Sequence, residues 1–135
     1  LDAMGAGVRM GDGWIECAGR GKLRAFDLDL NHIPDAAMTA AVLALFADGP
    51  SRLRNIASWR VKETDRLAAL SNELRRLGAD VDVQGDEAIS ILPPERFAPA
   101  WIETYDDHRM AMSFAIAGTR QSGITIRNIE CVNKT

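Results

Sequence analysis

The stretch Ala36–Ala47, AAMTAAVLALFA, constrains the fold more than any other, because Thr39 is its only polar side chain. A helix that is apolar on every side has to be buried on every side. Met110–Ala117, MAMSFAIA, has the same character, with Ser113 as its single polar residue. We therefore expect two helices that are buried nearly all round.

The other elements are expected to be one-sided. In Asp80–Val83 and Ala88–Leu92, apolar residues alternate with polar or small ones, which is typical of strands with one face in water. Glu63–Leu77 predicts an amphipathic helix with a stripe of leucines, Leu67, Leu70, Leu74 and Leu77. Further strands are expected at Val8–Met10, Trp14–Cys17, Arg52–Ile56 and Ile124–Ile129. Buried helices with sheets outside them indicate an α/β (α+β) fold in which the usual layering is inverted.

An internal repeat supports this interpretation. Three pairs of short segments match in the same order: MGAGV and LGADV, with glycines 78 − 5 = 73 residues apart, LRNI and IRNI, 126 − 53 = 73 apart, and DAAM and DHRM, 107 − 35 = 72 apart. The matches predict a β-α-β-α-β-β unit of about 73 residues. Residues 1–135 would hold about two such units of one domain.

Composition excludes several classes of protein. The chain has 135 residues, 47% of them hydrophobic, and a net charge of −3, which suits one globular unit. We expect no nucleic-acid partner, because no basic stripe with interleaved aromatics occurs. No apolar run is long enough for a membrane span. Two distant cysteines without CxxC or metal-ligand spacing argue against a disulfide framework, and a reducing cytoplasm fits them as well as any compartment.

Both ends of the sequence are abrupt. Leu1–Gly5 resembles the last turn of a helix with a glycine cap, and Cys131–Thr135 stops without a terminal element. We expect the chain to be a fragment.

Three segments carry residues that could do chemistry, and each lies at an expected helix start. In Asn31–Thr39, Pro34 suits the first position of a helix and Asp35 its first turn. Asp35 either only complements the helix dipole or, because the following helix is buried, faces a closed space at the N-terminus of that helix. His32 is interpreted as structural. In Ser58–Arg66, Lys62 and Glu63 lie at the mouth of the next helix.

A helix start with Lys62 and Arg66 beside it could bind an anion, although a solvated start with a surface ion pair is the commoner case. In the third segment, Asp106 or Asp107 should cap the helix. Arg109 then opposes the helix dipole, so it needs either one of these carboxylates or a bound anion.

Taken together, these helix starts indicate acid/base residues, Asp35 and Glu63, beside anion clamps, Arg66 and Arg109. Such a site would suit a phosphorylated, carboxylated substrate.

The strings NHIPDAAMT (31–39), RVKETDR (60–66) and DHRMAM (107–112) resemble signatures of the 5-enolpyruvylshikimate-3-phosphate synthase family, in the family's order. Lys134-Thr135 resembles its C-terminal lysine motif, although Lys134 alone would be interpreted as a surface lysine. The resemblance implies an inside-out α/β barrel, with two domains of three β-α-β-α-β-β units each, helices inside, sheets outside and ligands bound between the domains. It implies no metal or organic cofactor. The partner domain would be missing here.

The resemblance also implies a reaction and its residues. The enolpyruvyl group of phosphoenolpyruvate would pass to the 5-hydroxyl of shikimate 3-phosphate. This is a step of the shikimate pathway, which leads to chorismate and the aromatic amino acids. Enzymes of this family are the target of glyphosate. Asp35 matches the residue that binds and deprotonates this hydroxyl, and Glu63 the proton donor to C3. Ser58 and Lys62 match shikimate-phosphate contacts, with Ser58 standing where the family often has asparagine. The phosphoenolpyruvate clamp matches Arg66, Arg109 and Lys134, with His108 supporting. In an isolated chain these three cations are expected to face open solvent.

Two alternatives stay open. The UDP-N-acetylglucosamine enolpyruvyl transferase shares the fold but not these strings. A non-catalytic anion-binding domain of the same fold is the alternative from a different class.

Overall fold

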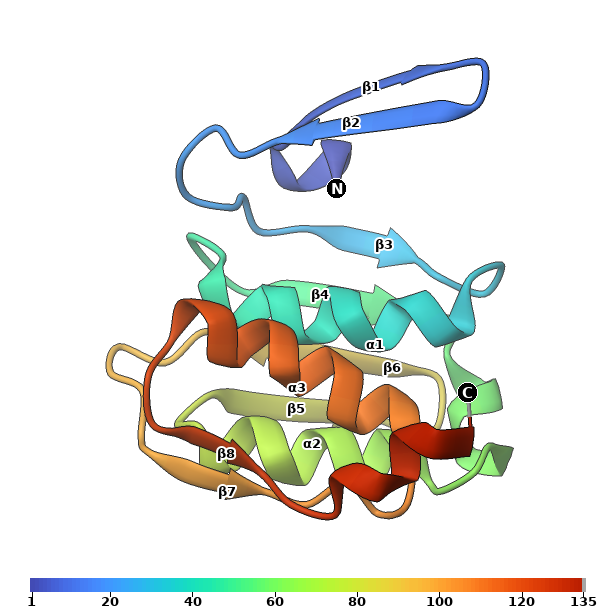
Figure 1. Cartoon of the computed structure of the whole chain (residues 1–135), viewed down its shortest axis with the longest axis vertical. Helices are drawn as coiled ribbons and strands as arrows, with labels where there is room; N and C mark the ends of the chain where they lie inside the picture. Colours follow the sequence, from blue (N-terminus) through green and yellow to red (C-terminus); the bar gives the residue numbers. More distant parts are fainter. Residues whose placement is uncertain (135) are drawn as a thin grey trace.

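The computed structural model describes the backbone of residues 1–134 and the side chains of residues 1–133. Three α-helices and eight strands are formed in this part of the chain (Figure 1). The helices are α1 (Pro34–Leu43), α2 (Arg66–Arg76) and α3 (His108–Arg120). The strands are β1 (Gly7–Gly11), β2 (Trp14–Ala18), β3 (Asp27–Asp29), β4 (Ser51–Arg54), β5 (Asp80–Gln84), β6 (Ala88–Leu92), β7 (Ala100–Ile102) and β8 (Ile124–Ile126). The expectation of a mixed α/β fold is confirmed.

The strands form three sheets. Four of them make the largest, in the order β3-β4-β6-β5, where β3 and β4 are parallel and the other neighbours antiparallel. The β1-β2 hairpin stands away from the body at one end, and β7 pairs in parallel with β8 beside α2 (Figure 1). Within the described residues, no helix is long and apolar enough to cross a membrane.

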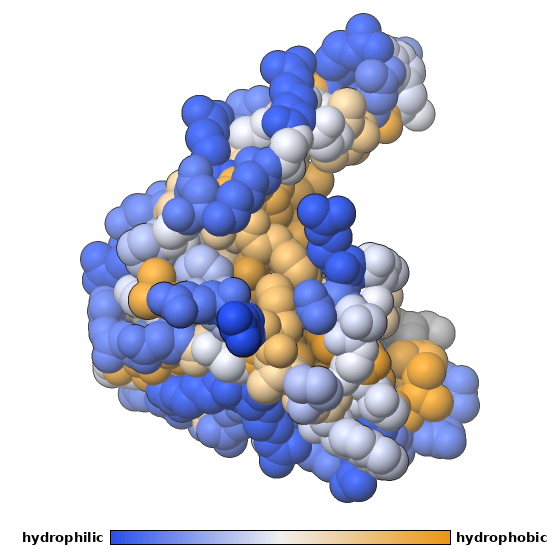
Figure 2. All heavy atoms as spheres, turned by 90° about the vertical axis from the view of Figure 1, so that its left-hand side faces the viewer, coloured by the Kyte–Doolittle hydropathy of each residue, from blue (hydrophilic) through white to orange (hydrophobic). Residues whose placement is uncertain are grey.

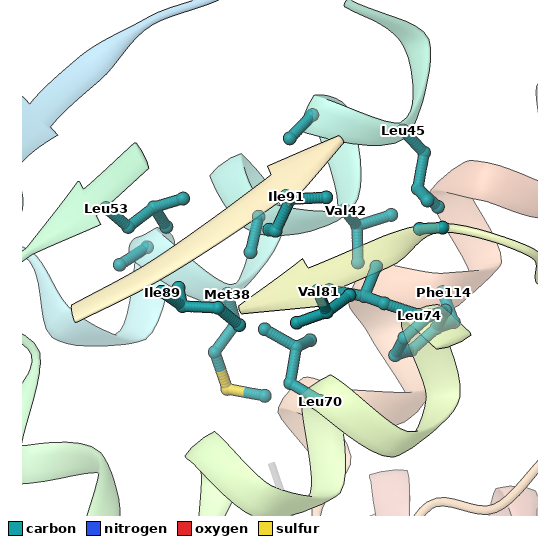
Figure 3. Packing of buried hydrophobic residues seen from close by; sticks show 14 of the residues in the cluster. Met38, Val42, Leu45, Leu53, Leu70, Leu74, Val81, Ile89, Ile91 and Phe114 are labelled. Atoms are coloured by element: carbon teal, nitrogen blue, oxygen red, sulfur yellow. The ribbon is translucent and has the colours of Figure 1, made fainter. Parts of the chain in front are cut away.

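The core lies between the four-stranded sheet and the helices. Val81 faces Ile91, and Val83 faces Ile89, across the β5-β6 pair, so the branched side chains gather on one face of the sheet. Figure 3 shows Val81, Ile89 and Ile91 packed against side chains of all three helices, among them Met38 of α1, Leu70 and Leu74 of α2 and Phe114 of α3. The opposite face carries exposed polar residues such as Asp82, as the alternation predicts.

The two apolar helices lie side by side, and only α1 is enclosed. Along α1 and the short turn after it, Ala36 is the one exposed residue up to Ala47. On α3, by contrast, Met112 and Ile116 are 49% and 41% exposed. The expectation of all-round burial is therefore wrong for α3. Its outer face is apolar, yet no described segment covers it.

Several elements differ from those expected. α1 ends at Leu43 and is followed by the 3₁₀ helix Ala44–Phe46, while β4 and β8 are shorter than expected and end at Arg54 and Ile126. α2 begins at Arg66 rather than near Glu63, because the side chain of Asp65 accepts the backbone N–H of Ala68 at 3.1 Å and caps the helix there. β3 and β7 are additional to the expected strands, since three-residue strands carry too little alternation to be recognised.

The paired segments of the sequence adopt similar local conformations. Gly5 and Gly78 come after helical turns and have φ of 87° and 96°, which is the left-handed conformation that glycine favours. Asn55 and Asn128, which come after β4 and β8, also have positive φ, at 59° and 48°. Asparagine is one of the few other residues that enter this region readily.

The single polar residues of the two apolar helices meet. The hydroxyl oxygens of Thr39 and Ser113 are 3.3 Å apart, so each satisfies the other inside an otherwise apolar contact between α1 and α3. At the C-terminal ends of these helices, an open groove of about 1080 Å³ is lined by apolar residues that include Leu43, Phe97 and Ile116. Apolar atoms are visible in this hollow between the hairpin and the body (Figure 2).

Candidate active site

The N-terminal ends of the three helices converge on one arginine. The guanidinium of Arg66, the first residue of α2, is 1% exposed and donates through all three of its nitrogens. Nε donates to Oδ2 of Asp107 at 2.8 Å, Nη1 to Oδ1 of Asp35 at 2.7 Å, and Nη2 to Oε2 of Glu63 at 2.7 Å. Hydrogen bonds between charged partners are the stronger class, and a buried guanidinium needs them.

Asp107 closes the buried side of this cluster. Its side chain is fully buried, and Oδ1 accepts the backbone N–H of Arg109 at 2.8 Å, which caps α3. The same carboxylate binds Arg66 through both oxygens, since Nη2 also lies 3.3 Å from Oδ1. One aspartate thus joins the starts of α2 and α3. Of the two candidates for the cap, the structure selects Asp107.

The open side consists of four partly exposed charges. Asp35, in the first turn of α1, is 44% exposed, and Glu63, in the loop before α2, is 43% exposed. Nη2 of Arg109 lies 3.5 Å from Oδ2 of Asp35, and Nζ of Lys62 lies 4.0 Å from Oδ1. Asp35, Glu63, Arg66 and Arg109 therefore lie together, as the sequence predicts, although they come from three separate segments.

The charges set the protonation of Asp35. The hydrogen bond from Arg66 holds the pKa of the Asp35 carboxyl below its usual value, and outweighs the opposing effect of burial. The charges of Arg66, Arg109 and Lys62 lower the pKa further. Asp35 is therefore a carboxylate at neutral pH, able to accept a hydrogen bond from a hydroxyl group.

Arg66 is held in its charged form. Burial alone would lower the pKa of its guanidinium, but the hydrogen bonds to Asp107 and Asp35 raise it. The expectation that Arg66 faces open solvent together with Arg109 and Lys134 is wrong for Arg66. Its guanidinium is buried where the starts of α1, α2 and α3 meet.

The remaining expected residues lie around this cluster. Ser58 is half-buried in the 3₁₀ helix Ala57–Val61, and His108 is half-buried in the first turn of α3. Lys62 and Glu63 come after that 3₁₀ helix as a bend, so both precede α2 and neither lies in its first turn. The side chain of Lys134 lies outside the described residues. Among the residues that are described, no group of histidine, cysteine or acidic side chains could hold a metal ion.

Sequence patterns miss the roles of two residues that shape this end of the molecule. Trp59 is fully buried and donates its indole N–H to the carbonyl of Pro34 at 2.8 Å, which ties the 3₁₀ helix to the start of α1. Asp107 is predicted only as a cap, whereas its bonds to Arg66 span 41 residues of sequence. Its position before a helix is a signal for the first role, and nothing local indicates the second.

Comparison with known proteins assigns the fold to a class. The structure is similar to an EPSP synthase from Acinetobacter baumannii, with a TM-score of 0.80 and 31% identity over 98% of this chain and 34% of that one. It shares its fold with the enolpyruvyl transferase NikO from Streptomyces tendae, with a TM-score of 0.68 and 21% identity over 98% of this chain and 30% of that one. The fold is that of the enolpyruvyl transferases.

The sequence defines the family more narrowly. The family model for EPSP synthase (3-phosphoshikimate 1-carboxyvinyltransferase) matches residues 1–135. Curated relatives with the name 3-phosphoshikimate 1-carboxyvinyltransferase include one from Janthinobacterium sp. (strain Marseille), 56% identical, and one from Serratia proteamaculans (strain 568), 53% identical. The matches cover all of this chain and 32% and 31% of those proteins, so the chain spans about a third of their length. The chain belongs to the EPSP synthase family.

Proposed function

We propose that the protein to which this chain belongs transfers the enolpyruvyl group of phosphoenolpyruvate to the 5-hydroxyl of shikimate 3-phosphate. The observation that carries the proposal is the Asp35 carboxylate, kept ionised by Arg66 and left partly open between Arg109 and Lys62. A carboxylate of this kind can take a proton from a hydroxyl, while the flanking cations suit a doubly anionic partner. Family membership and the names of the relatives support the same reaction.

Each residue of the open side has a role in this reaction. Asp35 accepts the proton of the 5-hydroxyl as the hydroxyl oxygen attacks C2 of phosphoenolpyruvate. Glu63 protonates C3. Return of a proton from C3 to the Glu63 carboxylate and departure of phosphate then restore the double bond. Lys62 and Ser58 bind shikimate 3-phosphate. No cofactor takes part in these steps.

Phosphoenolpyruvate is assigned to the cations. Arg109 and Lys134 are its contacts, with His108 in support beside Arg109. Arg66 already donates to three carboxylates, so a bond from Arg66 to the substrate would either come from the second N–H of Nη1 or require Glu63 to leave Nη2. Because Glu63 lies in a loop and is partly exposed, it is the one of the three carboxylates that can yield most easily.

We further propose how the chain fits into a complete domain. The pairs Gly5 and Gly78, and Asn55 and Asn128, support two copies of one unit of about 73 residues. The apolar, exposed face of α3 supports a further unit packed against it, which would put the helices inside and the sheets outside. A second domain, within the two thirds of the relatives that this chain does not match, would close over the open side of the cluster. The family assignment supports a cytoplasmic location.

The test is phosphate release by the full-length protein. Phosphoenolpyruvate with shikimate 3-phosphate should release phosphate, and phosphoenolpyruvate with UDP-N-acetylglucosamine should not. Asp35→Ala should lower turnover by about 10²- to 10⁴-fold, the range of general acid/base catalysis. Asp12→Ala, in the exposed turn of the β1-β2 hairpin, is the matched control and should retain turnover. Equal turnover of both variants would remove Asp35 from the mechanism, and no release with shikimate 3-phosphate would refute the function.

Residues 1–135 alone should show no transfer and should bind phosphoenolpyruvate weakly. Exposed ion pairs contribute roughly 0–1 kcal/mol each, whereas association costs several kcal/mol of lost freedom. Calorimetric titration of this chain with phosphoenolpyruvate, with and without shikimate 3-phosphate, measures the affinity. Tight binding would mean that the chain holds a complete site.

A further inference from the structure

One buried carboxylate lies away from the cluster of helix starts. Glu73, in the second half of α2, is fully buried although it is ionisable. Its Oε1 accepts the hydroxyl of Tyr105 at 2.8 Å, and its Oε2 accepts the backbone N–H of Glu103 at 3.2 Å. Nη1 of Arg76 lies 3.4 Å from Oε2. Both oxygens of Glu73 thus hold the segment that leads into α3.

This segment contains an unfavourable turn. Tyr105 and Asp106 have φ of 54° and 56°, so two consecutive residues other than glycine adopt the left-handed conformation. Such residues cost free energy and persist only where the surroundings fix them, which is common at functional sites. The turn begins at Thr104, which is fully buried and whose carbonyl accepts the N–H of Asp107 at 2.9 Å.

The turn sets the direction in which the chain enters α3. Asp107, two residues after Tyr105, enters the interior and binds Arg66 at 2.8 Å. Arg109, two residues further on, lies 3.5 Å from Asp35. A change in the conformation at Tyr105 would therefore move both residues relative to α1 and α2.

We propose that Glu73 and Tyr105 are positioning residues, whose hydrogen bond holds the turn at Tyr105 and Asp106 so that Asp107 meets Arg66 and Arg109 meets Asp35. The inference rests on the proposed function, because it concerns the placement of that site's cations. Burial, together with the bond to Glu73, raises the pKa of the Tyr105 hydroxyl. The hydroxyl accordingly stays protonated and able to donate at neutral pH.

The decisive variant is Tyr105→Phe in the full-length protein. It removes the bond to Glu73 and keeps the ring. Small displacements of positioning groups can cost about 100-fold in rate, so we expect kcat/KM for phosphoenolpyruvate to fall by about 10- to 100-fold. The KM for phosphoenolpyruvate should account for most of the change, while the KM for shikimate 3-phosphate should stay within about twofold, since Lys62 and Ser58 lie on another segment.

The matched control is Ser71→Ala. Ser71 is buried on the same helix, and its hydroxyl donates to the carbonyl of Leu67 at 2.6 Å, within α2 itself. Removing it deletes a buried hydroxyl without touching the turn, so kinetics should be unchanged. Glu73→Gln is the conservative variant. Its amide oxygen can accept either the Tyr105 hydroxyl or the backbone N–H of Glu103, but its NH2 group cannot accept the other, so it should lower kcat/KM in the same direction as Tyr105→Phe.

Hydrogen exchange provides a readout that does not depend on catalysis. In Tyr105→Phe the amide of Arg109, which binds Asp107, should exchange at least about tenfold faster relative to amides of the four-stranded sheet. The same ratio should be unchanged in Ser71→Ala. An unchanged Arg109 amide in both Tyr105→Phe and Glu73→Gln, or a kcat/KM within twofold of wild type in Tyr105→Phe, would overturn the positioning role. Absence of transfer in the wild type would instead refute the proposed function, and the exchange ratio would still decide whether the hydrogen bond positions Arg109.

Discussion

The buried and the open sides of the cluster use the same types of residue for different purposes. On the buried side, Arg66 and Asp107 are 1% and 0% exposed, and two hydrogen bonds join them. On the open side, Arg109 and Asp35 are 38% and 44% exposed and lie 3.5 Å apart. Charges removed from water need fixed partners, whereas hydrated charges can exchange theirs for a ligand. The first pair therefore organises the helices, and the second pair is available to a substrate.

The largest effect should come from breaking the buried side. Asp107→Ala leaves the guanidinium of Arg66 buried with one partner fewer, so the free energy of unfolding should fall by about 3–5 kcal/mol. Asp65→Ala is the matched control, because Asp65 also caps a helix but is partly exposed. Its loss should be about 1 kcal/mol. Urea unfolding of both variants measures the difference, and equal losses would mean that Asp107 acts as a cap only.

An intermediate effect should come from Asp35, which lies on the open side but accepts a hydrogen bond from the buried Arg66. Asp35→Asn keeps a hydrogen-bond acceptor for Arg66 but removes the charge, and should cost about 1–2 kcal/mol at neutral pH, discounted for partial hydration. The pKa of Asp35 is lowered in the folded chain, so its contribution is complete above the unfolded pKa, near 4, and is lost as pH falls through the folded pKa.

The check is the difference in unfolding free energy between wild type and Asp35→Asn as a function of pH. This difference should be constant above about pH 5 and should shrink as the solution is made more acidic than about pH 4. A difference that grows toward acid would contradict the lowered pKa.

The smallest effect should come from Glu63 on the open side. Glu63→Ala removes a 2.7 Å contact with Arg66, but the carboxylate is partly hydrated and lies in a loop. The free energy of unfolding should change by roughly 0–1 kcal/mol. Urea unfolding tests this, and a loss as large as that of Asp107→Ala would erase the distinction between the two sides.

Local signals in the sequence predict much of the fold. The leucine stripe of α2 is fully buried, and Pro34 and Asp35 lie at the start of α1 as their residue types indicate. The start of α2 is harder to place, because Glu63 and Asp65 are both acidic residues before the same helix. Only the hydrogen bond to Ala68 distinguishes the cap from its neighbour.

Long-range relations cannot be derived in the same way. Arg66 and Asp35 are recognisable in the sequence as charged helix starts, but their bond joins positions 31 residues apart. Likewise, α3 has the composition of an enclosed helix, yet Met112 is exposed in this chain. Periodicity reports how apolar a helix face is, and only the neighbouring segments decide whether that face is covered.

The contact between the hydroxyls of Thr39 and Ser113 fixes the position of α1 along α3. Thr39 lies 39 − 35 = 4 residues after Asp35, and Ser113 lies 113 − 109 = 4 residues after Arg109. An apolar surface alone would tolerate sliding, and a slip of one turn would displace the helices by about 5.4 Å. Because the two hydroxyls can form their hydrogen bond at one alignment only, the N-terminal starts of the two helices lie level with each other. Asp35 and Arg109 therefore stand opposite one another at the mouth of the site.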